Sequence, residues 1–300
     1  MNREIPVVIS AMGHCSAAGQ GLNSLRLAWL DGILPVPTRE TVLTANGPVD
    51  VFLFRSPNPN VPTFLPAAVE RRMSRFAKMC FVTVAEALAE ASVQENPQRT
   101  GLVVGTAFGF LDLANTYQKR IVKDGPAGAS PSLFAASIHN SLAAQLTLTF
   151  NIRGPNSTVS TMEQTSISAF RLAYDWIQHE LVDRVIVCLG DELSEFHVYW
   201  LAHQGLDFRA GEGAMTFVLE RQDRASKIYA QISAPQLSDV DIPAGLSVCH
   251  SRPDIYGTLP IGNAFEMALA ALSVERDGKA IACIQKTPGL AHQSIIFKSN

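Results

Sequence analysis

The chain has 300 residues, enough for one large domain or two fused ones, which excludes a small scaffold held by disulfides or a metal. Hydrophobic residues make up 47% and charged residues only 17%, which predicts a large buried core and excludes a disordered chain. The formal net charge of −3 leaves no cationic footprint, so we expect no nucleic-acid partner.

The five cysteines are scattered without a C-x-x-C spacing, and we interpret them as reduced core thiols. The apolar run near the N-terminus is interrupted by Gly13 and His14 before it could act as a secretory signal. No stretch reaches the roughly 18 uninterrupted apolar residues that a membrane helix requires. The sequence therefore predicts a cytoplasmic protein without a membrane span.

Strand-like and helix-like segments alternate along the first third of the chain. Residues 6–10 predict a buried strand, and a turn rich in glycine leads to a helix carrying the leucines of 22–30. The segment 35–66 is rich in proline and has no clear period, so we expect an irregular excursion on the surface. An apolar stripe from Ser74 onward predicts a helix, which leads to a strand at 101–106.

The alternation continues to the end of the chain. The further predicted elements are helices at 110–122, 137–149, 163–180 and 262–273, a loop at 125–131, and strands at 157–161, 182–192, 214–220, 228–232, 279–284 and 294–298. Strands alternating with helices of this length predict an α/β fold, in which a mostly buried sheet has helices on both faces. No linker or repeat divides the chain, so we expect one unit.

Several sequence signatures of catalysis are absent. The chain contains no G-x-x-x-x-G-K-[ST] loop, no G-x-G-x-x-G, no G-x-S-x-G and no H-E-x-x-H. Their absence argues against most nucleotide-binding, hydrolase and metalloprotease functions. The histidines are isolated, and Cys249-His250 has no second pair at ligand spacing, so we predict neither a metal site nor a cofactor.

Four blocks between Arg99 and Glu192 follow one another in a characteristic order. They read RTGLVVGTAFGF, SPSLFAASIHN, RGPNSTVSTMEQTSISAF and DRVIVCLGDE. In these blocks the chain resembles the β-ketoacyl-acyl carrier protein synthases, whose typical blocks are RTGVVVGTGxGG, SPFFxPxxxxN, RGPNxTVSTACASG and a strand ending in GGAE. The resemblance implies a thiolase-like, layered α/β/α fold. It also implies a synthase-like N-terminal half over 1–232 and an abbreviated C-terminal half over 233–300, within one compact unit.

The resemblance fails at the position of the family's nucleophile. Where the family has T-A-C-A-S, the chain has Thr161-Met162-Glu163-Gln164-Thr165. Glu163 replaces the cysteine and Gln164 is its neighbour, and neither side chain can form the thioester through which elongation passes. We therefore predict no catalytic residue at this degenerate position, where an acidic side chain in a first helical turn is also explained by the helix dipole.

The family's other active-site motifs are also missing. Its two histidines lie in H-G-T-G-T and G-H-x-x-G-A-A-G, but here His250 lies near the first without matching it. The second is replaced by residues 256–266, which contain no histidine, and the gate loop is replaced by 287–292. Because these groups act together in catalysis, we do not expect an independent condensing enzyme.

A synthase scaffold without a nucleophile is similar to the chain length factors of type II polyketide and aryl polyene pathways. This similarity implies a heterodimer with a catalytic ketoacyl synthase, an acyl carrier protein as a further partner, and a shared tunnel that buries an apolar acyl chain. The implied tunnel residues, for which core packing is the alternative, are Phe108, Phe110, Leu111, Leu133 and Phe134. The implied dimer-interface residues are Ser157, Thr158, Val159, Ser160, Thr161, His139 and Asn140.

Two enzymatic alternatives stay open at this point. The first is a malonyl-carrier decarboxylase that supplies a starter unit and uses Glu163 or Gln164. The second is a hydrolase or acyltransferase with Thr161, Thr165 or Ser166 as nucleophile, for which the sequence identifies no base.

Overall fold

The computed structural model describes residues 4–71, 73–91, 96–204, 209–236, 245–285 and 292–299. Its strands are β1 (Val7–Ser16), β2 (Gly19–Gln20), β3 (Thr38–Thr44), β4 (Gly47–Phe54), β5 (Thr100–Gly105), β6 (Asn156–Val159), β7 (Arg184–Asp191), β8 (Arg209–Gly211), β9 (Gly213–Arg221), β10 (Ala230–Ile232), β11 (Ser247–Val248), β12 (Ile281–Gln285) and β13 (Gln293–Lys298). Its α-helices are α1 (Leu22–Leu30), α2 (Ala67–Glu70), α3 (Arg75–Glu90), α4 (Leu111–Asp124), α5 (Pro131–Ser137), α6 (Ser141–Thr149), α7 (Thr165–Gln178), α8 (Glu195–Gln204), α9 (Pro253–Tyr256) and α10 (Asn263–Asp277).

The strands form one large sheet and one small sheet. The large sheet is mixed and has the order β11-β12-β13-β10-β1-β9-β7-β5-β6, with β2 paired to β1. Strands β5, β6 and β7 run parallel to one another, whereas β9 is antiparallel to both β7 and β1. The small sheet has the order β3-β4-β8.

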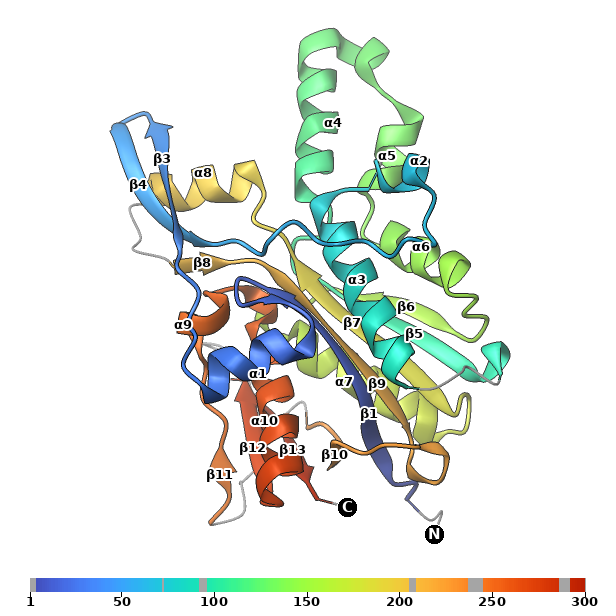
Figure 1. Cartoon of the computed structure of the whole chain (residues 1–300). Helices are drawn as coiled ribbons and strands as arrows, with labels where there is room; N and C mark the ends of the chain where they lie inside the picture. Colours follow the sequence, from blue (N-terminus) through green and yellow to red (C-terminus); the bar gives the residue numbers. More distant parts are fainter. Residues whose placement is uncertain are drawn as a thin grey trace.

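The large sheet is buried on both faces because its central strands carry apolar side chains at successive positions. In β7, Val185 and Val187 belong to the core on one face, whereas Ile186 and Cys188 belong to the core on the other. Helices α1, α7 and α10 cover the first face, and α3 and α6 cover the second (Figure 1). The predicted arrangement of a buried sheet between two helical layers is confirmed.

Strands β3 and β4 form a hairpin inside the segment that its prolines predict to be irregular. The prediction for 35–66 is therefore wrong over the strands. A two-residue turn joins Thr44 to Gly47, which has a φ of 109°. The Asn46-Gly47 dipeptide between two alternating runs is a known hairpin signal, and the prolines on both sides masked it.

Two other regions correct the sequence prediction. Between residues 125 and 149 the chain forms two helices where one was predicted. Helix α5 is the additional one, and Ser130 caps it by accepting a hydrogen bond from Leu133 N. The helix predicted at 137–149 begins only at Ser141. Helix α8 was not predicted, because apolar side chains occur all around it and give no amphipathic period. Residues 287–291 of the expected gate-loop replacement lie outside the described residues.

Candidate functional site

The chain turns abruptly between β6 and α7, at the position that corresponds to the family's nucleophile. Met162 has a φ of 52°, a left-handed conformation that is costly for a residue other than glycine. A short 3-10 helix, η3 (Met162–Gln164), follows and leads into α7. We call residues 160–164 the elbow. Its conformation is that of a tight turn at a helix N-terminus, although its residue types are not those of a nucleophile.

The elbow brings together no nucleophile and base among the described residues. Glu163 is exposed to solvent, and Gln164 is half-buried. The nearby hydroxyls have structural partners: Thr165 Oγ1 accepts from Thr161 N at 3.0 Å, and Ser166 Oγ donates to the Ile261 carbonyl at 3.4 Å. These contacts place Thr165 and Ser166 in the packing of the turn and do not activate either hydroxyl.

The segment that replaces the family's second histidine motif lies against the elbow. A 3-10 helix, η5 (Pro260–Gly262), packs on η3, and the Ser166–Ile261 hydrogen bond joins η5 to the first turn of α7. His250, the histidine nearest to the family's first motif in the sequence, is exposed. The fold thus places both degenerate motifs side by side, and no histidine among the described residues is hydrogen-bonded to Glu163.

Strand β6 is the last strand of the large sheet and pairs only with β5 among the described strands. The carbonyls of Pro155 and Val159 accept hydrogen bonds from Leu102 N and Thr106 N of the β5 side. Because backbone groups alternate along a strand, those of Asn156, Thr158 and Ser160 face away from β5. The predicted interface segment 157–161 therefore lies along a free sheet edge that runs into the elbow.

Helices α4 and α5 stand beyond the body of the sheet, and none of their side chains is fully buried (Figure 1). The predicted interface residues His139 and Asn140, which lie between α5 and α6, are exposed. We call β6, the elbow, α4, α5 and residues 138–140 the open face. Its exposed large apolar side chains are Val122, Phe134, Ile138 and Met162. Exposed large apolar side chains and an unpaired strand edge are both typical of a surface that a second polypeptide covers.

The turn between β5 and α4 connects the large sheet to the open face. It carries Phe108, whose ring centroid is 4.5 Å from that of His197 on α8. Ser160 Oγ of the elbow donates to the Ala107 carbonyl at 3.4 Å, and the ring of His139 would contact any side chain added at Gly109. The turn therefore joins the elbow to the predicted interface residues.

The five predicted tunnel residues occupy different environments. Phe110 is buried in the core, and its ring centroid is 5.0 Å from that of Phe76 on α3. Leu111 and Leu133 are half-buried, whereas Phe134 is 53% exposed and lies against Tyr117 of α4. Phe108 and Phe134 thus lie at or near the open face, and Phe110 packs as an ordinary core residue.

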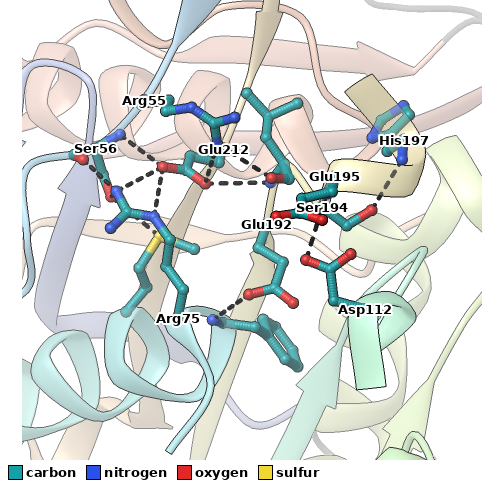
Figure 2. Close-up of polar contacts among 12 residues, drawn as sticks. Arg55, Ser56, Arg75, Asp112, Glu192, Ser194, Glu195, His197 and Glu212 are labelled. Carbon is teal, nitrogen blue, oxygen red and sulfur yellow. Dashed lines mark hydrogen bonds and ion pairs between the residues drawn. The ribbon is translucent and has the colours of Figure 1, made fainter. Parts of the chain in front are cut away.

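Figure 2 shows a buried polar network at the ends of β4, β7 and β8. At its centre is Glu212, which is fully buried and accepts hydrogen bonds from Ser56 N at 3.0 Å, Arg75 Nε at 2.8 Å and Leu193 N at 3.2 Å. Its other labelled members are Arg55, Asp112, Glu192, Ser194, Glu195 and His197. The network ties both sheets to the first turn of α3.

Two further carboxylates of this network hold helix N-termini. Glu192 Oε2 accepts from Phe76 N at 2.7 Å in the first turn of α3, and Asp112 Oδ2 accepts from Glu195 N at 3.4 Å at the start of α8. Burial raises the pKa of Glu192 to about 7 and also raises the pKa of Asp112. These contacts fix α3, α4 and α8, and so they place His197 against Phe108.

Sequence reasoning missed the acidic side chains that end the buried strands, Asp191, Glu192 and Glu212. The available signal was the occurrence of carboxylates directly after or between apolar strand residues, in CLGDE and AGEGA. Buried carboxylates require donors, and here the donors are backbone amides, a hydroxyl and a guanidinium group. Within the described residues, no group of three or more His, Cys, Asp or Glu side chains is placed to hold a metal ion.

Comparison with known proteins agrees with this geometry. Residues 6–210 match the family described as the β-ketoacyl synthase N-terminal domain. A 3-oxoacyl-[acyl-carrier-protein] synthase 2 of Vibrio cholerae is 24% identical over 75% of this chain and 61% of its own length. The chain thus spans about three-fifths of the length of the curated relatives that it matches first. Of the described helices, none is both long and apolar enough to cross a membrane.

Solved structures give the same fold. A complex of a type II polyketide acyl-carrier protein with its ketosynthase has a TM-score of 0.80 at 14% identity, covering 99% of this chain and 100% of that one. A ketosynthase in complex with its chain length factor, from Xenorhabdus doucetiae, has a TM-score of 0.73 at 15% identity, covering 99% and 98%. The predicted thiolase-like fold is confirmed, and the chain belongs to the β-ketoacyl synthase family through the N-terminal domain of that family.

Proposed function

We propose that this chain is a non-catalytic subunit of the chain length factor type, which pairs with a catalytic ketoacyl synthase and shapes the acyl pocket of the pair. The observation that carries this proposal is the elbow, where Glu163 replaces a nucleophile and lies exposed beside a free strand edge. A synthase that worked alone would need a thiolate and a base at this position.

The open face supports pairing in particular. Phe134, Ile138 and Met162 of the open face expose large apolar side chains, and no side chain of α4 or α5 is fully buried. A partner that covered these side chains would remove apolar surface from water and would complete the hydrogen bonds of the β6 edge. An acyl chain held at this junction would be shielded from water on both sides.

The decarboxylase alternative has less support from the site. Glu163 is exposed, and no described histidine is hydrogen-bonded at the elbow. The proposal also includes docking of an acyl carrier protein and a place in type II polyketide synthesis, as in the ketosynthase complex named above, or in aryl polyene synthesis, as the resemblance of the sequence implies. The free cysteines are consistent with a reducing, cytoplasmic environment.

Co-expression with a catalytic ketoacyl synthase that retains the T-A-C motif tests the proposal. We expect a one-to-one complex in size-exclusion chromatography and native mass spectrometry. A well-behaved monomer that does not bind the synthase would overturn the proposal. In the complex, Phe108→Ala should lengthen the products, since it removes bulk from the proposed pocket, and unchanged product lengths would exclude Phe108 from that pocket.

A further inference from the structure

Asp191 ends β7 where the family's typical strand reads Gly-Gly-Ala-Glu and this chain reads Leu-Gly-Asp-Glu. Its side chain is 2% exposed and faces the turn between β5 and α4. An alanine at this position would need no partner, whereas a buried carboxylate is costly unless several donors surround it. The substitution therefore introduces a strong acceptor beneath the turn that carries Phe108.

The carboxylate of Asp191 binds three successive residues of that turn. Its Oδ1 accepts from Thr106 Oγ1 at 2.6 Å, from Ala107 N at 3.0 Å and from Phe108 N at 2.9 Å. The Thr106 hydroxyl oxygen in turn accepts from Gly109 N at 2.8 Å. Charge-assisted hydrogen bonds to consecutive amides fix a turn more firmly than sheet pairing alone, which ends here at Gly105.

The turn contacts α8 on one side and the elbow on the other. Phe108 lies against His197 on one side, and the Ala107 carbonyl accepts from Ser160 Oγ of the elbow on the other. We propose that Asp191 is a positioning residue that holds the Phe108 ring in place and thereby sets how deep an acyl chain can extend between the paired subunits. This inference rests on the proposed function, since it needs Phe108 to line a shared pocket.

The acid form of Asp191 would hold the turn less well, because a protonated carboxyl places a donor where the turn offers donors. Burial raises the pKa of Asp191 to about 6 even though the turn amides and the Thr106 hydroxyl lower it. The groups around it are those neutral donors, Gly213 across the β7–β9 pair, and the Cys80 thiol of α3. Burial, the neighbouring Cys188 and the Asp191 charge all raise the pKa of that thiol. Glu192, next in the chain, binds α3 instead.

Amide hydrogen exchange of the isolated chain tests the positioning step. Asp191→Asn should lower the protection of the Ala107 and Phe108 amides by about tenfold or more, because one charge-assisted acceptor is lost. Glu192→Gln is the matched control, and it should leave these two amides unchanged. In the unmodified chain, their protection factors should fall as the pH drops below about 6. Unchanged protection in Asp191→Asn, or protection independent of pH if that variant does not fold, would overturn the inference.

Product lengths of the complex with a catalytic synthase test the functional step. Asp191→Asn should shift the product lengths in the same direction as Phe108→Ala. If Phe108→Ala changes product length and Asp191→Asn does not, the inference is wrong and the proposed function stands. If exchange rises in Asp191→Asn but neither variant changes product length, the proposed pocket at Phe108 is wrong instead.

Discussion

The buried polar network and the open face lie on two sides of one turn and differ in their contacts within the chain. In the network, Glu192 and Glu212 accept hydrogen bonds from amides and arginine of the same chain. On the open face, no side chain of α4 or α5 is fully buried, and β6 ends the sheet. The contrast indicates that contacts within this chain build the scaffold, whereas the surface around the elbow is the one that the proposed partner would cover.

The largest expected effect comes from breaking the network at its centre. Glu212→Ala should lower the free energy of unfolding by about 3 kcal/mol or more, since it leaves Arg75 and two buried amides without their acceptor. Urea denaturation measures the change. Arg39→Ala, which removes an exposed ion pair with Asp50, is the control and should have little effect. Equal effects of the two variants would contradict the central role of Glu212.

The second prediction uses the raised pKa of Glu192, about 7 in the folded chain. Because the folded state binds this proton more tightly, the stability that protonated Glu192 contributes is complete below about pH 4.5 and is lost as the pH rises through 7. The expected loss is about 3 kcal/mol. Glu192→Gln stays neutral, so its free energy of unfolding relative to the unmodified chain should rise with pH over this range. A difference in free energy of unfolding between the two proteins that does not change with pH would exclude a raised pKa for Glu192.

The third prediction addresses the β6 edge of the open face. Thr158→Pro removes an amide that faces away from β5, so it should weaken synthase binding by about 100-fold while the isolated chain stays folded. Isothermal calorimetry and circular dichroism measure these two properties. Thr158→Ala keeps the amide and serves as the control. Full binding by the proline variant would show that the partner does not pair with this edge.

The smallest effect concerns strain at the elbow. Met162→Gly should raise the free energy of unfolding by about 1 kcal/mol. Glycine adopts the left-handed conformation without the steric cost that Met162 pays, and that relief should exceed the entropy cost of a more flexible unfolded chain. Met162→Ala meets the same steric cost and should bring no gain. Thermal denaturation of the two variants checks the difference, and a gain for alanine alone would indicate that side-chain size matters and backbone conformation does not.

The large sheet could be predicted from sequence because its signals are local and strong. Runs such as VIVCL and AMTFVLE are long enough to cross a core, and the helix from Ser74 has one clear apolar stripe. The hairpin at 38–54 was missed because nearby prolines outweighed the Asn46-Gly47 signal. Helix α8 was missed because its outward side is also apolar, with Tyr199 and Trp200 exposed.

The degenerate elbow could be predicted from the motif order, but its supporting residues could not. Asp191 and Glu212 act through donors that lie 84 and 156 positions away in the chain, at Ala107 and Ser56. Only the folded sheet brings such partners together, since no spacing rule connects them. Which predicted tunnel residue packs in the core and which lies at the surface is likewise decided by tertiary contacts, as Phe110 and Phe134 show.

The most direct test is intact-protein mass spectrometry of the co-purified pair after incubation with an acyl thioester of the carrier protein. The proposed division of labour predicts a covalent acyl group on the synthase subunit and an unmodified mass for this chain. An acyl group attached to this chain, whether at Glu163 or at a hydroxyl of the elbow, would contradict the claim that it shapes the pocket without taking part in bond formation.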